Sequence, residues 1–168
     1  DEMEPTFAFA KEMGAYYVSI NCGRDNHEIA EQAIAIAKQY GLKLGIHNHG
    51  PGASFETAEQ VLAFCEGKDA LLGACVDTGH FMRSDQMPDH VIKVLGRRIN
   101  SMHLKDFVSA EEEVIPGTGR LDFAQALALL KSEAGYEGAY VIEYEADPKD
   151  PSPAIKQTLD VLMKAAEG

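Results

Sequence analysis

The chain lacks long apolar runs, and this absence limits where it can work. No apolar stretch in its 168 residues approaches the ~20 residues that span a bilayer. Residues 1–15 also lack the basic region and the apolar core of a secretory signal. We therefore expect no membrane partner and a cytoplasmic location.

Paired cysteines and an excess of basic charge are absent as well. The three cysteines, Cys22, Cys65 and Cys75, are odd in number and show no CxxC spacing, which favours reduced structural thiols. The chain has 15 basic and 27 acidic residues, a formal net charge of −12 that repels nucleic acid and anionic membranes. We expect no nucleic-acid partner, whereas an anionic substrate stays possible because a bound metal can reverse the local sign.

The sequence also lacks a phosphate-binding glycine motif. The segment PGTGR at 116–120 has neither GxGxxG nor Walker spacing, so we interpret it as a mobile loop. Arg83 and Arg120 could hold a substrate phosphate, but solitary loop arginines are more often surface residues. The acidic run at 111–113 is most simply a solvated loop.

Helical and strand patterns alternate regularly along the chain. Helix-ending glycines such as Gly14 and Gly41, together with β-branched runs, mark the borders. The alternation predicts an α/β fold with a parallel sheet and helical crossovers. The expected strands are 16–20, 43–48, 72–77, 99–104 and 139–145. The expected helices are 6–13, 27–40 with Asn26 as N-cap, 57–65, 90–95, 123–134 and 153–166, with a long acidic loop over 106–119.

Five strands are too few for a complete TIM barrel, which has eight strands and typically ~250 residues. The shortfall matches three strand-helix units of at least ~30 residues each. We therefore expect a TIM-barrel-type fold that is incomplete: one domain over 1–168, made of the last five strand-helix units and lacking its amino-terminal strands. The alternative is an open, doubly wound sheet of order 2-1-3-4-5, but ligand-type residues at consecutive strand ends favour the barrel.

An incomplete barrel has two free edges. We expect the five strands in sequential spatial order, with the strand at 16–20 at one edge and the strand at 139–145 at the other. Apolar residues such as Val18, Ile20 and Val141 should line the open side. Free edges favour association, so a homo-oligomer is one expected state.

Four strand ends carry side chains of the kind that bind divalent metals. In a parallel barrel the carboxyl ends of the strands open onto one face, where active sites are built. The residues are His47 and His49 in GIHNHG, Asp77 and His80 in CVDTGH, His103 and Lys105 in MHLKD, and Glu143 and Glu145 in VIEYE.

Each of these residues has a structural alternative when taken alone. His47 and His49 share one strand face, so either both bind a metal or one of them contacts substrate. Asp77 ends an apolar run, where a buried carboxylate is costly without a metal, a partner or water, and a turn at 78–79 would present His80.

The later strand ends are equally ambiguous by themselves. A lone His103 is more often structural than a ligand, Glu143 is deep enough to need a partner, and Glu145 could be solvated. Together, two histidines, one aspartate and one glutamate from separate strand ends form a mixed nitrogen and oxygen site. Such a site suits Mn²⁺, Co²⁺, Zn²⁺ or Mg²⁺.

The strings HNHG, DTGH, HLKD, PGTGRLDF and GYEGAYVIEYE resemble the sugar phosphate isomerase/epimerase family, which has a xylose isomerase-like barrel. The resemblance covers essentially the whole chain and aligns it with the later strands of that barrel. It implies that Asp77, His103 and Glu143 bind one divalent metal ion, with His47 as fourth ligand, and that His80 faces the substrate. The implied substrate is a small sugar, keto-sugar or inosose.

The first ligand position departs from the family pattern. Where the family commonly has ENH, this chain has His47, Asn48 and His49, so a histidine replaces one of two glutamates that act as paired acid/base groups. The resemblance implies a sugar or sugar phosphate isomerase or epimerase that removes a proton next to a carbonyl, through an enediolate held by the metal. Glu143 is then the expected base, and the acid is His49, His80 or Lys105.

Other functions remain open at this stage. The HxH string also resembles inosose dehydratases, so a keto-inositol or keto-sugar dehydratase or lyase is the main alternative. A metal-dependent endonuclease of the same superfamily would need a basic groove, which the acidic composition argues against. A non-catalytic sugar-binding domain is less well supported, because the expected ligands and base are all retained.

Overall fold

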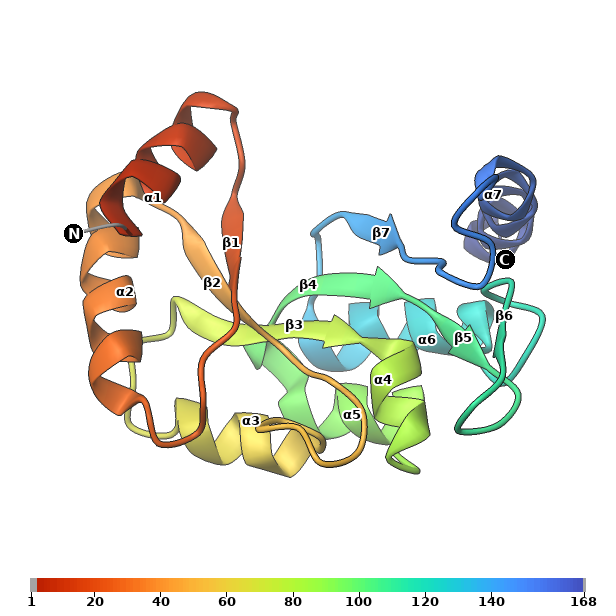
Figure 1. The fold of residues 1–168 in the computed structure, drawn as a ribbon, viewed down its shortest axis with the longest axis horizontal. Coiled ribbons are helices and arrows are strands. Elements are labelled where there is room, and N and C mark those ends of the chain that lie inside the picture. The colour runs from red at the N-terminus through yellow and green to blue at the C-terminus, as the bar shows by residue number, and fades with distance from the viewer. Residues whose placement is uncertain (1–2, 168) are drawn as a thin grey trace.

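Five parallel strands form one curved sheet in which spatial order follows sequence order, β1-β2-β3-β4-β7 (Figure 1). The computed structural model describes residues 3–167. The order confirms an incomplete barrel and contradicts the doubly wound alternative. The strands are β1 (Tyr17–Ile20), β2 (Lys43–His47), β3 (Leu72–Asp77), β4 (Ile99–Leu104) and β7 (Tyr140–Ile142).

Helices follow the strands and cover the outer side of the curve (Figure 1). Buried side chains of the helices and strands form one continuous apolar core. None of the described helices is long and apolar enough to cross a bilayer. The helices are α1 (Met3–Glu12), α2 (His27–Tyr40), α3 (Ala58–Cys65), α4 (Thr78–Arg83), α5 (Pro88–Leu95), α6 (Phe123–Leu129) and α7 (Ser152–Ala166), with a 3-10 turn at Gly96–Arg98 and a π turn at Leu130–Ala134.

Local sequence signals set several of these boundaries. Gly41 ends α2 in the left-handed conformation at φ 64°, and its N–H bonds back to the last turn. Thr57 begins α3 through a capping box with Gln60. Asn26 occupies the N-cap of α2, but its side chain makes no capping hydrogen bond, so that part of the prediction was wrong.

The register brings the strand ends to one level. His47 pairs with Cys75 across β2 and β3, Asp77 pairs with His103 across β3 and β4, and Leu104 pairs with Ile142 across β4 and β7. In a parallel sheet this alignment places the residues that end each strand, or follow it, on the same rim. The described chain therefore has one rim that gathers the predicted polar side chains.

Three expected boundaries needed correction. Residues 78–79 form no isolated turn: they begin α4, because the Asp77 side chain caps that helix. The loop over 106–119 contains a two-stranded antiparallel ribbon, β5 (Asp106–Phe107) with β6 (Glu113–Val114). The last strand ends at Ile142, so Glu143 and Glu145 lie just beyond it rather than within it.

The glycine-containing loop after β6 is anchored by a single carboxylate. Asp106 is fully buried, and its two oxygens accept five backbone N–H bonds of 2.8–3.0 Å. Arg120 is half-buried and donates to the carbonyl oxygens of Phe107 and Met82. The loop is therefore held in place, which corrects its interpretation as mobile, and Arg120 serves the fold rather than the open surface. The donors are the N–H groups of Phe107, Gly117, Gly119, Arg120 and Leu121.

The two edge strands approach each other at their amino ends. The Tyr16 hydroxyl, beside β1, accepts a hydrogen bond from the Ala139 backbone N–H at 3.1 Å, next to β7. Val18 and Ile20 are half-buried and pack against the core, while Val141 is 38% exposed. Val18 and Ile20 are register partners of the buried Leu44 and Ile46 and share their helix-facing side of the sheet, so their predicted place on the open side was wrong. Val141 is the register partner of His103 and lies on the open side, as expected. Tyr16 bridges the amino ends of the two edge strands.

Candidate metal centre

Four side chains from four strand ends converge on one point. One donor atom from each of His47, Asp77, His103 and Glu143 lies within 4.8 Å of the other three. His47 Nε2 is 3.4 Å from His103 Nδ1 and 3.9 Å from Glu143 Oε2, and the latter two atoms are 2.6 Å apart. The structure therefore brings together all four residues predicted as ligands.

Asp77 contributes a carboxylate with two different environments. The residue is fully buried, and its Oδ1 accepts the backbone N–H of His80 at 2.8 Å. Its Oδ2 is buried and has no hydrogen-bond partner. Burial and the nearby Glu143 raise the pKa of Asp77, because the charged form is poorly solvated there. An unpartnered buried acceptor beside three other donors fits a cation ligand.

The pair formed by His103 and Glu143 is strongly polarised. The hydrogen bond from His103, together with the charge of Lys105, holds the pKa of Glu143 below its usual range. Burial alone would lower the pKa of His103, but contacts with Cys75 and Glu143 raise it instead. A divalent ion at this point would replace the proton that the pair now shares.

Lys105 adds a positive charge directly beside this pair. Its side chain is 1% exposed, and its Nζ donates to Glu143 Oε1 at 3.2 Å and also contacts Glu145 Oε2. Gly79 leaves room for the Lys105 stem, since a Cβ there would lie 2.8 Å from it. Burial opposes the charge, but the hydrogen bond with Glu145 raises the pKa of Lys105, so the ammonium stays protonated.

Three histidine rings form a triangle on the rim, with the centroids of His47 and His80 6.1 Å apart. Ring centroids are 4.8 Å apart for His47 and His49, and 5.4 Å apart for His49 and His80. Burial and the nearby imidazoles lower the pKa of His47 to about 4, and burial with the Lys105 charge lowers that of His80 to about 4. Both rings are therefore neutral at neutral pH, and each keeps one nitrogen lone pair that can bind a metal or accept a hydrogen bond.

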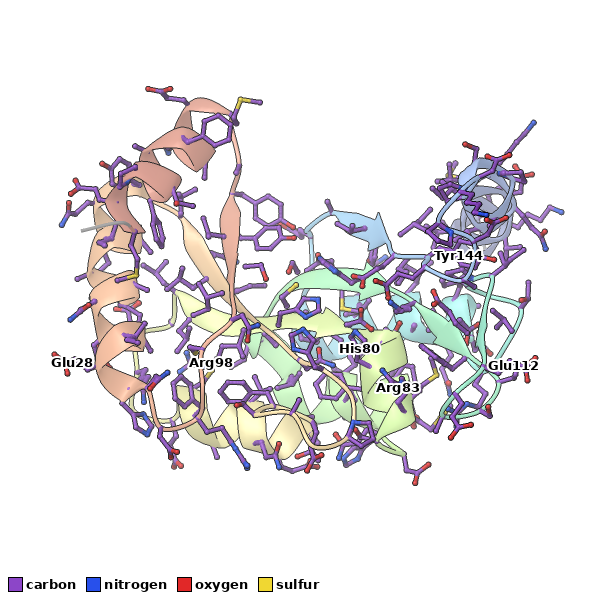
Figure 2. The ribbon with its side chains drawn as sticks, viewed as in Figure 1. Glu28, His80, Arg83, Arg98, Glu112 and Tyr144 are labelled. Atoms are coloured by element: carbon purple, nitrogen blue, oxygen red, sulfur yellow. The ribbon has the colours of Figure 1, made fainter. Side chains whose placement is uncertain are left out.

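The tautomer of His80 follows from its neighbour. His80 and Arg83 both project from α4 (Figure 2), and Arg83 Nη1 lies 3.4 Å from His80 Nδ1. A guanidinium only donates hydrogen bonds, so Nδ1 accepts and the ring proton sits on Nε2. Arg83 also donates to the Ala110 carbonyl oxygen, and so belongs to the rim rather than to an isolated surface position.

Two uncharged residues that we did not predict fix the rim. Asn48 is buried between His47 and His49, and it exchanges two hydrogen bonds with the backbone of Asp77. The Thr78 hydroxyl accepts the N–H of Lys105 and donates to its carbonyl oxygen. The only sequence signal for Asn48 and Thr78 is that each is a polar residue next to a predicted ligand at a strand end.

Comparisons with known proteins agree with this geometry. The model of the xylose isomerase-like TIM barrel family matches residues 1–165. The chain belongs to that family. An inosose dehydratase from Clostridium botulinum is 30% identical over an alignment of 153 residues, and the match covers 78% of this chain and 51% of that protein. The chain thus spans about half the length of the curated relatives it matches.

Solved structures show the same fold. A xylose isomerase domain protein from Planctomyces limnophilus matches with a TM-score of 0.83 and 22% identity, over 99% of this chain and 65% of that one. The IOLI protein with a binding zinc atom matches with a TM-score of 0.76 and 21% identity, over 98% of this chain and 69% of that one. At these sequence identities, the likeness shows a shared fold and nothing more specific.

Proposed function

We propose that this chain carries the metal site of a dehydratase that acts on a keto-inositol or a related keto-sugar. The observation that carries the proposal is the unpartnered Asp77 Oδ2 among the donor atoms of His47, His103 and Glu143. The inosose dehydratase relatives point to the substrate class. The isomerase or epimerase expected from the sequence is less well supported, because the named relatives at about this identity are dehydratases.

The proposed ligands are the four converging donors. A Zn²⁺, Mn²⁺, Co²⁺ or Mg²⁺ ion held by them would polarise a carbonyl oxygen and so acidify the neighbouring C–H bond. The IOLI protein, which shares this fold, binds zinc, and this supports a divalent ion here. A neutral imidazole and carboxylates with little competing solvent suit this role.

We assign Glu143 to binding rather than to proton removal. Its carboxylate already faces His103 and Lys105, and a carboxylate with a lowered pKa is a weak base. This differs from the role that the family resemblance implied. Two imidazoles beside the cluster are not proposed ligands, His49 and His80. Because Nδ1 of His80 already accepts from Arg83, we assign the removal of the substrate proton to His49.

The other two expected catalytic residues then receive distinct roles. His80 presents its Nε2–H and acts as a hydrogen-bond donor to substrate oxygen. Lys105 is cationic, so it offsets the negative charge that develops on substrate oxygen. The proton that His49 takes from carbon passes to the departing hydroxyl, which leaves as water and completes the elimination.

Product analysis in deuterated water tests the proposal. The protein with added Mn²⁺ or Zn²⁺ is incubated with an inosose, and the mixture is followed by proton NMR. We expect loss of the C–H signal next to the ketone and the appearance of the dehydrated product. Exchange with formation of an isomeric sugar would favour the isomerase or epimerase instead, and a metal-loaded protein that catalyses neither reaction would contradict both.

A further inference from the structure

Beneath the four proposed ligands lies a thiol that the proposed function does not use. Cys75 precedes Asp77 by two residues on β3, so both side chains leave the same face of the sheet. It is the register partner of His47 and is fully buried. The Sγ atom of Cys75 and a ring nitrogen from each of His47 and His103 lie within 4.8 Å of one another.

The backbone is shaped to admit this side chain. A Cβ at Gly45, two residues before His47 on β2, would lie 2.8 Å from the Cβ of Cys75. Only glycine at position 45 allows the Cys75 side chain to lie this close to β2.

Cys75 differs in this respect from the other two cysteines. All three are buried and free, but within the described chain only Cys75 belongs to a group of three or more donor atoms at metal-binding separation. Burial is the largest cause of the raised pKa of Cys65, about 11, and the nearby charges of Arg98 and Lys68 oppose it, as is ordinary for a buried structural thiol. A structural role for Cys75 would not require two imidazoles beside it.

We propose that Cys75 is a sulfur ligand that sets the metal preference of this site. With His47 and His103 it forms a second donor set of two nitrogens and one sulfur, one layer below Asp77 and Glu143. The proposal rests on the proposed function in one respect, namely that both histidines bind the metal. Because the two sets share these histidines, one ion at a time is bound.

The sulfur changes which ions the site prefers. Thiolate is a soft ligand that favours Zn²⁺ and Cd²⁺, whereas carboxylates suit Mn²⁺ and Mg²⁺. When the ion binds, the thiol proton leaves to solvent and the sulfur becomes an anionic donor. Thiophilic ions should therefore use Cys75, and hard ions should bind through Asp77 and Glu143 without it.

Titration with Cd²⁺ and with Mn²⁺ tests the proposal. We expect one equivalent of Cd²⁺ to produce an ultraviolet thiolate charge-transfer band in the wild-type protein and in Cys22→Ser, the matched control. Cys75→Ser should lack the band and bind Cd²⁺ ~10-fold or more weakly, on the scale of a lost ligand-shell contact. Its Mn²⁺ affinity should stay within about 2-fold of wild type, since that ion does not use sulfur.

The outcomes separate this inference from the proposed function. Cd²⁺ binding without the band, or a band that persists in Cys75→Ser, would overturn the sulfur ligand and leave the carboxylate site standing. Failure of both ions to bind the folded wild-type protein would overturn both proposals. The cadmium NMR chemical shift of the wild-type protein reports sulfur ligation directly, so the test holds even if Cys75→Ser does not fold.

Discussion

Asp77 and His80 are joined by a hydrogen bond of 2.8 Å from the backbone N–H of His80 to Oδ1 of Asp77. That bond caps α4 and orients the carboxylate, so that Oδ2 remains buried and unpartnered beside the histidines. A single side chain thus starts the helix that carries His80 and offers an acceptor to the proposed ion. Removing the charge while keeping the cap should separate these two roles.

Asp77→Asn is the variant that makes this separation. Its remaining side-chain oxygen can still cap α4, but the negative charge is lost. We expect metal affinity to fall by ~100-fold or more, which exceeds the 10- to 100-fold loss typical when a residue that contacts a metal ligand is replaced. Without metal the variant should be at least as stable as wild type, because an uncompensated buried charge is costly. Calorimetric metal titration and thermal unfolding with a chelator measure the two effects. A clear loss of metal-free stability would show that Asp77 is chiefly structural.

Two further variants, at His49 and Glu143, separate metal binding from proton removal. We expect His49→Gln to bind Mn²⁺ normally and to lose C–H exchange by ~100-fold or more, the scale of a lost general base. Glu143→Gln should lose both metal affinity and exchange, because a charged ligand is removed. His90→Gln, on the exposed face of α5, is the control. If Glu143→Gln bound metal normally but lost exchange, Glu143 would be the base and His49 would not.

The buried Asp106 should be among the most stabilising polar residues outside the proposed site. In Asp106→Asn one oxygen becomes an amide that faces N–H donors, so at least two of the five hydrogen bonds are lost. We expect a loss of ~2–4 kcal/mol in the free energy of unfolding, since buried donors are left unpaired. Urea unfolding checks this, with the exposed Glu111→Gln as control. A loss equal to that of the control would refute the anchoring role.

Acid should weaken the contact between α3 and α5. Glu59 accepts hydrogen bonds from Gln86 at 2.9 Å and His90 at 2.6 Å, and these lower its pKa to about 2. A carboxyl whose pKa is lower when folded stabilises the protein above its unfolded pKa of about 4.3, and loses that effect as pH falls toward the folded value.

The size of this effect is limited by solvent. The Glu59 and His90 side chains are both about half exposed. We expect less than about 1 kcal/mol. Glu59→Gln should show a smaller drop in melting temperature than wild type between about pH 5 and pH 3. Parallel slopes for the two proteins over that range would remove Glu59 from the acid response.

Much of the fold could be predicted because parallel strands and their crossovers leave strong periodic signals. The six buried residues of β3 appear in the sequence as a continuous apolar run that ends in Asp77. Four of the five strand ends were located to within one residue, whereas β7 ends three residues before its predicted end. The strand ends together with the family resemblance predicted the four proposed ligands. The shape of the loop after β4 could not be predicted, because it depends on which distant backbone N–H groups donate to Asp106.

The roles within the site were harder to predict for the same reason. Sequence spacing shows that Cys75 and Asp77 share a face, but only the register places the thiol opposite His47. Likewise, nothing near Glu143 in the chain indicates that His103 and Lys105 both hold its carboxylate. Long-range contacts decide which carboxylate is a ligand and which group is free to take a proton.

The most direct test of the central claim is a crystal of the protein grown with Mn²⁺ and examined by anomalous diffraction. We predict a single strong peak among His47 Nε2, Asp77 Oδ2, His103 Nδ1 and Glu143 Oε2, at about 2.0 to 2.3 Å from each. Crystals of Asp77→Asn grown in the same way should show a much weaker peak or none. A peak elsewhere, or a His47 ring turned away from the ion, would contradict the four-ligand site.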